Sequence, residues 1–546
     1  MMSARHAPSA GFLFGGFGIV ALGVLLGFAT DVAANALTPV KGAFVLGGFA
    51  LLIPTMVLKN PKAYWLFLLV LSIPFDISKW LSAGLVDPQT LVDLYGQPAS
   101  GTTAIEVYLT DAVLVAMLLP WLARICLRQE RLFFPNIGHL FVFYLAWALL
   151  VSVINAESFY LAMFELCRQT LYFLSFVYLI NNVRTRLQFQ SAVWAVFLGF
   201  IIGSGTVITF FELGYGTETS FFSILHEQPV TGAHKPGSKK APDAGTLTLE
   251  STGRGLGKGG AQEAGLKRSQ GIFRHPAIPA SLCGLILPIV LAYLIAARTS
   301  RERFLLFMVF VLGITALVLT FSRAGAIGLA VGTVVFIAVG GWSGLIPRRV
   351  LVVGVVALTL VGALSIPLLF IYFGARPETF YMRLNLFEAA LQGYSEHPFL
   401  GVGLNNATGA MKVGRQEFKD LGIQMPPTES ADSLYLVVLT EVGPLGFILF
   451  FLFFGKLVMI ALRAMRQVAT DLKPLLVGIV AGLASLATQN LADDTLGGHA
   501  ISAMLWLLAG LIVAAARYIQ AETRSGSMGG RSTGSSHLPP VIPRMV

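Results

Sequence analysis

The sequence predicts an all-α polytopic membrane protein with about 14 transmembrane helices (12–14) and two long outer loops. Of its 546 residues, 55% are hydrophobic and only 12% are charged, which is about half the charge of a typical soluble domain. The mean hydropathy is +0.75, and apolar runs of the length that crosses a bilayer, roughly 20 residues, recur along the whole chain. These observations exclude a soluble enzyme and a protein with a single membrane anchor.

The apolar runs define the predicted spans in order. The first run starts at Gly11 and is long enough to cross the membrane, so we interpret it as a retained helix and not as a cleaved signal peptide. The predicted spans are 11–33, 42–58, 63–82, 105–123, 137–155, 160–181, 190–213, 277–297, 303–321, 324–342, 349–373, 433–455, 474–492 and 500–516.

The distribution of basic residues predicts the orientation. If the N-terminus is cytoplasmic, Arg and Lys gather in the cytoplasmic connections, whereas the short outer loops contain only Lys41, Lys79 and Arg323. Basic loops are retained in the cytoplasm, so both termini are predicted to be cytoplasmic. The net charge of +10 is thereby explained without a nucleic-acid partner. The three cysteines have no paired spacing, so neither a disulfide framework nor a zinc site is predicted.

The spans and loops divide the chain into six predicted regions. Residues 231–265 are rich in Gly and Lys and poor in apolar residues, which predicts a mobile insert. The regions are an N-terminal transmembrane bundle (1–213), an outer loop with this insert (214–276), transmembrane helices (277–373), a second outer loop with helices (374–432), C-terminal transmembrane helices (433–516) and a disordered cytoplasmic tail (517–546).

The first polar motif is FSRAG at 321–325, which places Arg323 at the outer boundary between two spans. An arginine at a membrane boundary is costly unless it snorkels, pairs or binds an anion. In the second loop, Arg376 and Arg383 are seven residues apart, two helical turns, and can face the same way. A salt-bridged surface residue and an anion ligand both remain open for Arg383.

Two further motifs flank predicted spans. ESADSLYL places Asp432 directly before the span that starts at 433, where it can cap the helix or act as a general base. RSQGIFRHP at 268–276 precedes the span that starts at 277. Its Gly and Pro can be helix punctuation, or its Arg268 and His275 can belong to a site.

The order of these motifs resembles the O-antigen ligase and Wzy-type polymerase superfamily of bacterial membrane glycosyltransferases, over residues 268–446. The resemblance rests on four pieces in sequence. They are G-x-F-x-H-P at Gly271–Pro276, S-R-[AG]-G at Ser322–Gly325, an Arg-led helix from Arg383 into H-P-x-x-G-x-G at His397–Gly403, and Y-L followed by E-x-G-x-x-G at Tyr435–Gly446. Ligases of this family typically have His-Asn before Tyr-Leu, and that His is regarded as catalytic. Here Asp432 and Ser433 take those places, which favours a polymerase over a lipid A-core ligase.

The resemblance implies a GT-C-like fold in the bacterial inner membrane and a glycan donor linked to undecaprenyl pyrophosphate. It implies an active site on the periplasmic face, an acceptor glycan as second substrate, and a chain-length regulator and a flippase as further partners. Arginine suits phosphate groups because its planar fork binds two oxygens. We therefore expect Arg323 and Arg383 to hold the pyrophosphate and Asp432 to accept the proton of the acceptor hydroxyl. Further substrate-binding candidates are Arg376, Arg268, His275, His397 and Tyr435.

No cofactor is expected, and transfer is predicted to be independent of metal. Asp493 and Asp494 are the nearest candidate ligands, but two adjacent acids do not form an octahedral site alone. A lipid-linked glycan flippase is the alternative from another class, since its span count also fits. Transporters of that kind are commonly built from two related halves, and the chain has no visible half-to-half similarity. Glu165 and Arg168 are three residues apart and are expected to form a local ion pair.

Overall fold

The computed structural model describes residues 61–74, 78–80, 106–213, 268–273, 275–349, 351–352, 377–411, 431–467 and 471–529. The chain divides into two compact units, Met1–Phe67 and Leu68–Val546. Helix α4 (Pro61–Ser72) holds the described residues of the first unit. All of the packing and the sites described below belong to the second unit.

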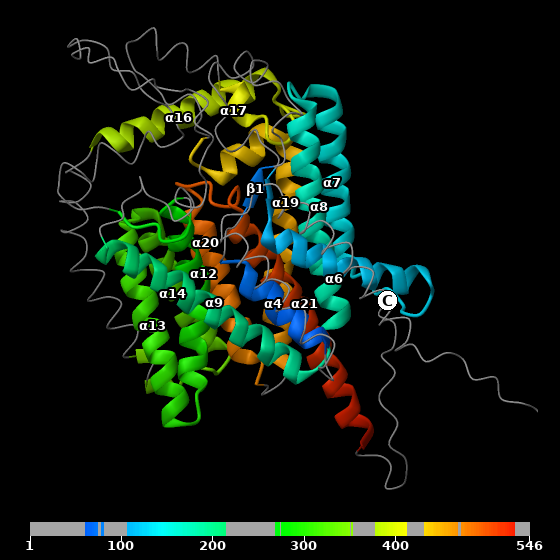
Figure 1. Ribbon diagram of the computed structural model, residues 1–546, viewed down its shortest axis with the longest axis vertical. Coiled ribbons are helices and arrows are strands. Elements are labelled where there is room, and N and C mark those ends of the chain that lie inside the picture. The colour runs from blue at the N-terminus through cyan, green and yellow to red at the C-terminus, as the bar shows by residue number, and fades with distance from the viewer. Residues whose placement is uncertain are drawn as a thin grey trace, which may run out of the picture. The chain divides into compact units, whose positions relative to one another are not determined.

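The described chain is helical apart from one short antiparallel pair, in which Ser78 pairs with Tyr108 and Trp80 with Glu106. Figure 1 shows the helices of the second unit packed into a bundle, with α16 and α17 across one end. In chain order the elements are β1 (Ser78–Trp80), β2 (Glu106–Tyr108), α6 (Leu109–Cys126), α7 (Asn136–Asn155), α8 (Phe159–Asn182), α9 (Arg186–Glu212), α12 (Ala277–Ala296), α13 (Ser300–Thr320), α14 (Arg323–Trp342), α16 (Pro377–Glu396), α17 (Ala407–Ala410), α19 (Leu434–Gln467), α20 (Lys473–Gln489) and α21 (His499–Gly529).

The described helices make this a multi-pass membrane protein. Eight of them are long and apolar enough to cross a membrane, and α4 and α20 are shorter apolar helices. Each predicted span within the described ranges overlaps a helix. The predicted spans 11–33 and 42–58, and nearly all of 349–373, lie outside the described residues. The helix expected to lead from Arg383 toward His397 is confirmed as α16.

Three predictions need correction. The predicted span 63–82 is wrong in its second half, because α4 ends at Ser72 just before Pro74 and residues 78–80 form a strand. A proline disfavours helical geometry in the residue that precedes it. The predicted disordered tail is wrong over 517–529, where α21 continues, because extending an existing helix costs far less than nucleating one. The single span predicted at 433–455 is broken, as described below.

Small residues bring α12, α14 and α20 into close contact. Gly478 and Gly482 of α20 face the backbone of Ile289 and Leu285 in α12, and a side chain at either position would collide with that backbone. Ser485 of α20 fits against Gly328 and Gly332 of α14 and against Gly284 of α12. Close backbone approach through small residues is the usual way in which membrane helices associate, and it makes these three helices a tightly packed unit.

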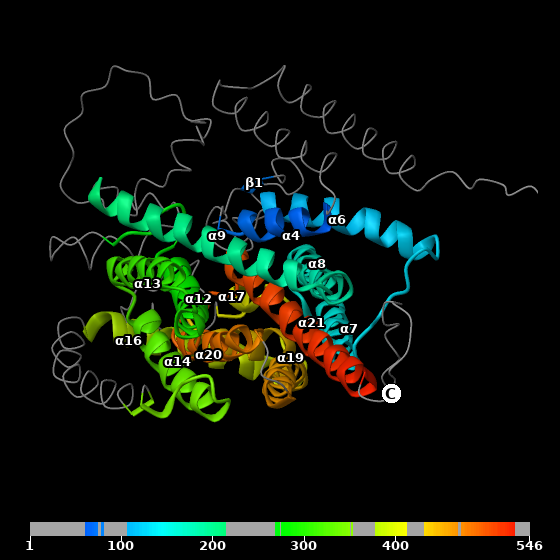
Figure 2. The ribbon, with the colours of Figure 1, turned by 90° about the horizontal axis from the view of Figure 1, so that it is seen from below.

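Helix α21 is enclosed by its neighbours, and Figure 2 shows it running beside α8 and α19. Its Trp506 lies 4.5 Å from the ring of Phe141 on α7 and 5.3 Å from that of Phe453 on α19, measured between ring centroids. Aromatic pairs at such distances add to the stability that burial alone provides. This aromatic core holds α7, α8, α19 and α21 together.

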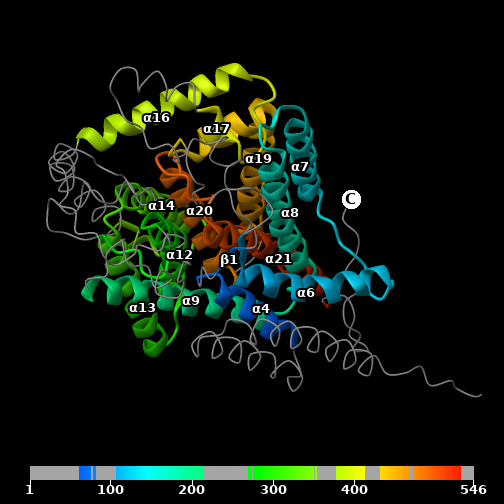
Figure 3. The ribbon, with the colours of Figure 1, turned by 45° about the horizontal axis from the view of Figure 1, so that its top comes forward.

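The connections between helices group at two ends of the bundle, as the topology predicted from charge requires. At one end, Asp471 pairs with Arg186 and lies 3.3 Å from Arg298, which joins three connections predicted to be cytoplasmic. At the other, the α16 end, the side chain of Asn155 at the end of α7 donates a hydrogen bond to the carbonyl of Gly401, and the N–H of Leu434 donates to the carbonyl of Asn490. Figure 3 shows α16 and α17 at this end, with α16 reaching α19. The identity of the α16 end as the periplasmic end stays a prediction.

Candidate active site

Three charged side chains from distant parts of the chain meet at the α16 end, and we call them the charged cluster. Arg383 lies on α16, Asp432 directly before α19, and Asp493 in the loop between α20 and α21. Arg383 Nε lies 3.5 Å from Asp432 Oδ2, and Arg383 Nη2 lies 3.2 Å from Asp493 Oδ1. The side chains of Arg383 and Asp432 are 37% and 31% exposed, so the cluster can be reached from solvent.

The loop that carries Asp493 is fixed by Asn490. The Asn490 side-chain oxygen accepts hydrogen bonds from the backbone N–H of Thr495, at 3.0 Å, and from its hydroxyl, at 3.2 Å. The Asn490 carbonyl accepts a hydrogen bond from the Leu434 N–H at 3.1 Å, which ties this loop to the start of α19. Gln489 donates to the second oxygen of Asp493 at 3.4 Å. These contacts set the positions of Asp432 and Asp493 relative to each other.

Burial and the charge of Arg383 have opposite effects on the pKa values of Asp432 and Asp493. Asp432 adopts a left-handed conformation, with φ 44°, which Asp tolerates better than most residues. Burial raises the pKa of Asp432, and Arg383 partly offsets this. Burial likewise raises the pKa of Asp493 to about 6, with Arg383 lowering it and Asp432 raising it. A carboxylate with a raised pKa is a better proton acceptor near neutral pH.

Helix α19 breaks at Gly443, and its two arms fold back on each other. Gly443 has φ 65° and ψ −176°, a conformation that essentially only glycine adopts, and Pro444 follows. The rings of Tyr435 and Phe451 stack at 4.8 Å, whereas a straight helix would separate these residues by about 24 Å. The sequence analysis missed this break because the residues on both sides of Gly443 and Pro444 are apolar, so hydropathy does not change at the break.

The broken helix brings the start of α19 to the end of α20. The Tyr435 hydroxyl donates a hydrogen bond to the carbonyl of Ala487, near the last residue of α20, at 3.0 Å. Asp432, directly before α19, therefore lies near the loop that carries Asp493.

The H-P-x-x-G-x-G motif caps the broken helix. Val402 and Gly403 donate backbone hydrogen bonds to the carbonyls of Thr440 and Glu441 at 2.9 and 2.8 Å, and Trp147 donates its ring N–H to the Val442 carbonyl at 2.8 Å. The last carbonyls of a helix need such partners. Gly401, with φ 83°, allows the loop to approach the break. The motif therefore has a structural explanation.

His397 lies away from the charged cluster. It follows the last residue of α16, about 20 Å along the helix axis from Arg383. Its ring is exposed, and its carbonyl accepts the hydrogen bond of Gly401 at 2.9 Å. Substrate binding by His397 remains a prediction that would require a ligand long enough to span this distance.

The S-R-A-G motif forms a tight turn beside Arg268. Phe321 closes α13 in a left-handed conformation, and the Ser322 hydroxyl caps α14 by accepting the N–H of Gly325 at 3.1 Å. Arg323 is the first residue of α14. The Arg268 Nε–H donates to the carbonyl of Thr320 at 3.1 Å. The turn therefore lies beside Arg268, whose charge also acts on Asp493.

The side chain of His275 helps to start α12. Its Nδ1 accepts a hydrogen bond from the N–H of Ala277 at 3.2 Å, so the neutral ring carries its proton on Nε2. Desolvation by the surrounding protein, together with the charges of Arg268 and Arg383, lowers the pKa of His275 to about 4. The residue is accessible to solvent. His275 can therefore offer a neutral N–H donor close to two arginines.

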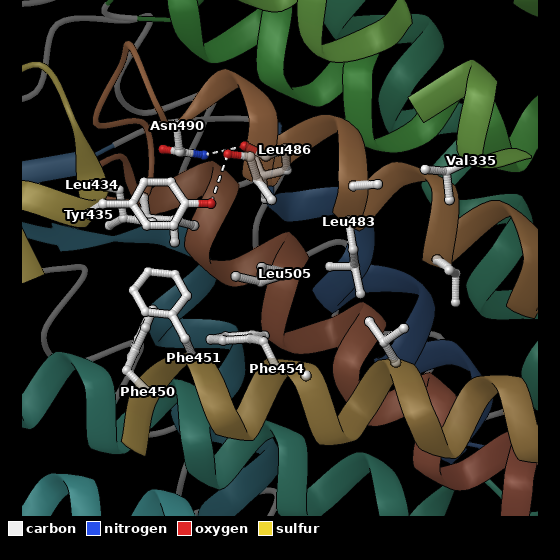
Figure 4. A pocket seen from close by; sticks show the side chains of 16 residues that line it. Val335, Leu434, Tyr435, Phe450, Phe451, Phe454, Leu483, Leu486, Asn490 and Leu505 are labelled. Atoms are coloured by element: carbon white, nitrogen blue, oxygen red, sulfur yellow. Dashed lines mark hydrogen bonds between the residues drawn. The ribbon is translucent and has the colours of Figure 1, made fainter. Parts of the chain in front are cut away.

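An apolar groove of about 330 Å³ opens next to the cluster. It lies between the two arms of α19 and the helices α14, α20 and α21. Figure 4 shows Tyr435 and Asn490 at one end of it and Phe454 and Leu483 farther along. Because Asn490 holds both Leu434 and the Asp493 loop, the groove begins beside the charged cluster.

A second polar group, the buried cluster, consists of Asp111, Glu165, Arg168, Asp494 and His499. Arg168 lies 2.5 Å from Glu165, which confirms the predicted ion pair. His499 Nδ1 lies 3.9 Å from Asp111 and 2.5 Å from the hydroxyl of Tyr172. Burial raises the pKa of Asp494 to about 6, with Glu165 and Asp432 raising it and Arg168 lowering it. This cluster is enclosed between α6, α8 and α21.

The structure thus unites part of the predicted site. Arg383 and Asp432 meet directly, Arg268 and His275 lie beside them, and Tyr435 lines the groove, while Arg376 lies outside the described residues. Asp493 was considered in the sequence only as a metal ligand. Its signal was an acidic pair in an otherwise apolar segment. In the part of the chain that the structure describes, no group of three or more His, Cys, Asp or Glu side chains is arranged to hold a metal ion.

Comparison with known families agrees with this arrangement. Residues 308–451 match the family model described as O-antigen ligase, a family that covers O-antigen ligases and related polymerases. The matched segment contains the FSRAG turn, Arg383, the capping loop of α19 and Asp432, whereas Arg268 and His275 precede it. The resemblance seen in the sequence is therefore confirmed over this segment. No curated protein matches the chain.

Proposed function

We propose that this protein, whose residues 308–451 carry the O-antigen ligase family match, is a Wzy-type polymerase of an exopolysaccharide or O-antigen. It transfers glycan from undecaprenyl pyrophosphate to a lipid-linked repeat unit at the periplasmic face of the inner membrane. The observation that carries the proposal is the contact of Arg383 with Asp432, at 3.5 Å. It places a cation for the leaving group beside a base for the acceptor.

The chemistry follows from these two groups. The acceptor hydroxyl gives its proton to Asp432 while its oxygen bonds to the anomeric carbon of the donor. The bond from that carbon to the pyrophosphate oxygen breaks, and its electron pair leaves with undecaprenyl pyrophosphate. Arg383 and Arg268, together with Arg323 on the turn that Arg268 contacts, stabilise the negative charge that develops there. Partial burial strengthens these interactions compared with open water.

The apolar groove supports a lipid-linked donor. A polyprenyl chain is apolar and lies in the bilayer, while its pyrophosphate must reach the arginines at the membrane boundary. The groove is lined by Tyr435, Phe451 and Phe454 of α19 and by Leu483 of α20, both of which are apolar helices. A chain that enters it from the bilayer leaves hydrocarbon and not water, so close packing favours its binding.

Transfer without a bound metal ion is part of the proposal, because arginines supply the positive charge. We expect EDTA to leave the transfer rate unchanged when the full-length protein is assayed in vesicles. A loss of activity that added Mg²⁺ or Mn²⁺ restores would contradict this part of the proposal.

The ligase is the alternative within the same chemistry. It shares the donor but uses lipid A-core sugar, or a protein, as acceptor. Asp432 and Ser433 stand where the family's ligases typically carry His-Asn, and this favours the polymerase. A flippase is the alternative of another class, and the buried cluster is the feature that a transporter could use. The solvent-accessible position of the charged cluster favours surface chemistry instead.

The envelope glycans of a deletion strain test all three functions. A polymerase predicts single repeat units that accumulate on the lipid carrier, and complementation with the intact gene should restore long chains. Full-length chains that remain on the carrier would instead indicate a ligase. Repeat units that are trapped on the cytoplasmic side would indicate a flippase and would contradict the proposal.

A further inference from the structure

Asp493 shares the guanidinium of Arg383 with Asp432. Two different nitrogens of Arg383 face the two carboxylates, Nε toward Asp432 and Nη2 toward Asp493, at 3.5 and 3.2 Å. The side chain of Asp493 is only 11% exposed, and Gln489 donates a hydrogen bond to its other oxygen. Asp493 is therefore held in place, and its carboxylate can anchor the more exposed side chain of Arg383.

We infer that Asp493 is a positioning residue for the proposed transfer, which holds Arg383 so that the guanidinium faces the leaving group without fully neutralising Asp432. The inference rests on the proposed function, because it assigns Asp493 a part in the same reaction. It needs no contact between Asp493 and the substrate.

The charges around the two carboxylates explain this role. Asp432 faces Arg383 from α16, and Asp493 and Asp494 from the loop before α21. Asp493 in turn faces Arg383, Asp432 and Arg268. Arg383 is shared by two carboxylates, so it lowers the pKa of each one less than a separate cation would. The two negative charges also repel each other, and this repulsion raises the pKa of both carboxyls.

Removing the charge of Asp493 should therefore weaken Asp432 as a base. Arg383 would pair with Asp432 alone, and the repulsion from Asp493 would disappear. Both changes lower the pKa of Asp432. The acidic limb of the pH profile would move to lower pH, and the maximal rate would fall because a weaker base accepts the proton less readily.

The test compares Asp493→Asn with wild-type full-length protein in lipid vesicles, with lipid-linked glycan purified from the deletion strain as substrate. We expect the acidic limb of kcat/KM to move down by about one pH unit and kcat to fall by about tenfold. KM for the donor should stay within about twofold. Asp493→Glu should restore the wild-type limb, because it restores the charge.

Asp494→Asn is the matched control, since it removes the charge of the neighbouring residue. Asp494 faces the buried cluster and has only a minor electrostatic interaction with Asp432. The acidic limb of the pH profile of Asp494→Asn should therefore move by less than half as much as that of Asp493→Asn. If the acidic limb of kcat/KM in Asp493→Asn lies at the same pH as in the wild type, with or without a lower rate, the inference is overturned. If Asp493→Asn does not fold, Asp493→Ser makes the same comparison.

The proposed function can fail separately. If Asp432→Asn keeps full transfer activity, the proposed chemistry is wrong whatever Asp493 does. If Asp432→Asn is inactive while neither Asp493→Asn nor Asp493→Ser moves the limb, only the positioning role is wrong.

Discussion

The charged cluster and the buried cluster use the same residue types but differ in how the chain holds them. In the charged cluster, the side chains of Arg383 and Asp432 are more than 30% exposed. Arg383 lies on α16, and Asp432 lies directly before α19. In the buried cluster, Arg168 and Glu165 are 20% and 13% exposed and lie one turn apart on a single helix. The first arrangement leaves room for a ligand, whereas in the second Arg168 and Glu165 pair with each other on one helix. An arginine in an apolar chain is therefore a candidate for catalysis only when its partners leave it accessible.

The largest expected effect is the loss of transfer in Arg383→Ala. This substitution removes the cation beside Asp432 and Asp493, and losing one group that stabilises the developing charge costs about 10²- to 10³-fold in rate. Product formation in vesicles is the measurement, with the amount of membrane-inserted protein as control. Arg383→Lys should recover only part of the activity, because an ammonium cannot face both carboxylates with separate nitrogens. Wild-type rates in Arg383→Ala would remove this residue from the mechanism.

Substitutions in the buried cluster should affect stability more than chemistry. Glu165→Gln leaves Arg168 without its charged partner, and breaking a buried pair in this way costs about 3–5 kcal/mol. Thermal unfolding in detergent measures the loss. The double variant Glu165→Met with Arg168→Met should recover most of the stability, because it removes both charges. If the single variant unfolds like the wild type but transfers glycan poorly, the two clusters do not divide their roles as described.

The break in α19 sets the position of the arm that follows Asp432, and Gly443→Ala tests it. The φ and ψ of Gly443 are unfavourable for alanine by about 1–3 kcal/mol, and the added methyl group would meet the backbone of Phe399 and Leu400. We expect a lower unfolding temperature and reduced transfer, because the arm that starts at Asp432 would shift. Gly205→Ala on α9 is the control, since no atom lies within 4 Å of its added methyl group. Equal stability of the two variants would argue against a rigid break.

The smallest expected effect concerns His275. Its pKa of about 4 in the folded protein is below the value of about 6.5 in an unfolded chain. The unfolded state therefore binds more protons between these values, and stability falls as the pH decreases from 6.5 to 4. His275→Asn can retain the contact with the Ala277 N–H, and it should unfold with a weaker pH dependence in this window. An unchanged pH dependence would mean that His275 titrates normally.

The sequence predicted the helices well because apolar length is a local property. It placed Arg383 and Asp432 in one site only through the order of the family's motifs. It could not predict their contact, which depends on α16 crossing the bundle and on the fold-back of α19 at Gly443. The contact of Asp493 with Arg383 was not predicted for the same reason, since Arg383 lies more than a hundred residues earlier in the chain. The role of the H-P-x-x-G-x-G loop as a cap for α19 also became visible only from hydrogen bonds between separate segments.

The most direct test of the proposed chemistry is the release of undecaprenyl pyrophosphate from lipid-linked glycan by purified Asp432→Asn in vesicles. This substitution keeps the size of the side chain and removes its basicity. The account predicts that release falls at least about 10²-fold while the protein remains folded and still binds the donor. Release at the wild-type rate would show that Asp432 does not accept the proton, and it would contradict the proposed mechanism.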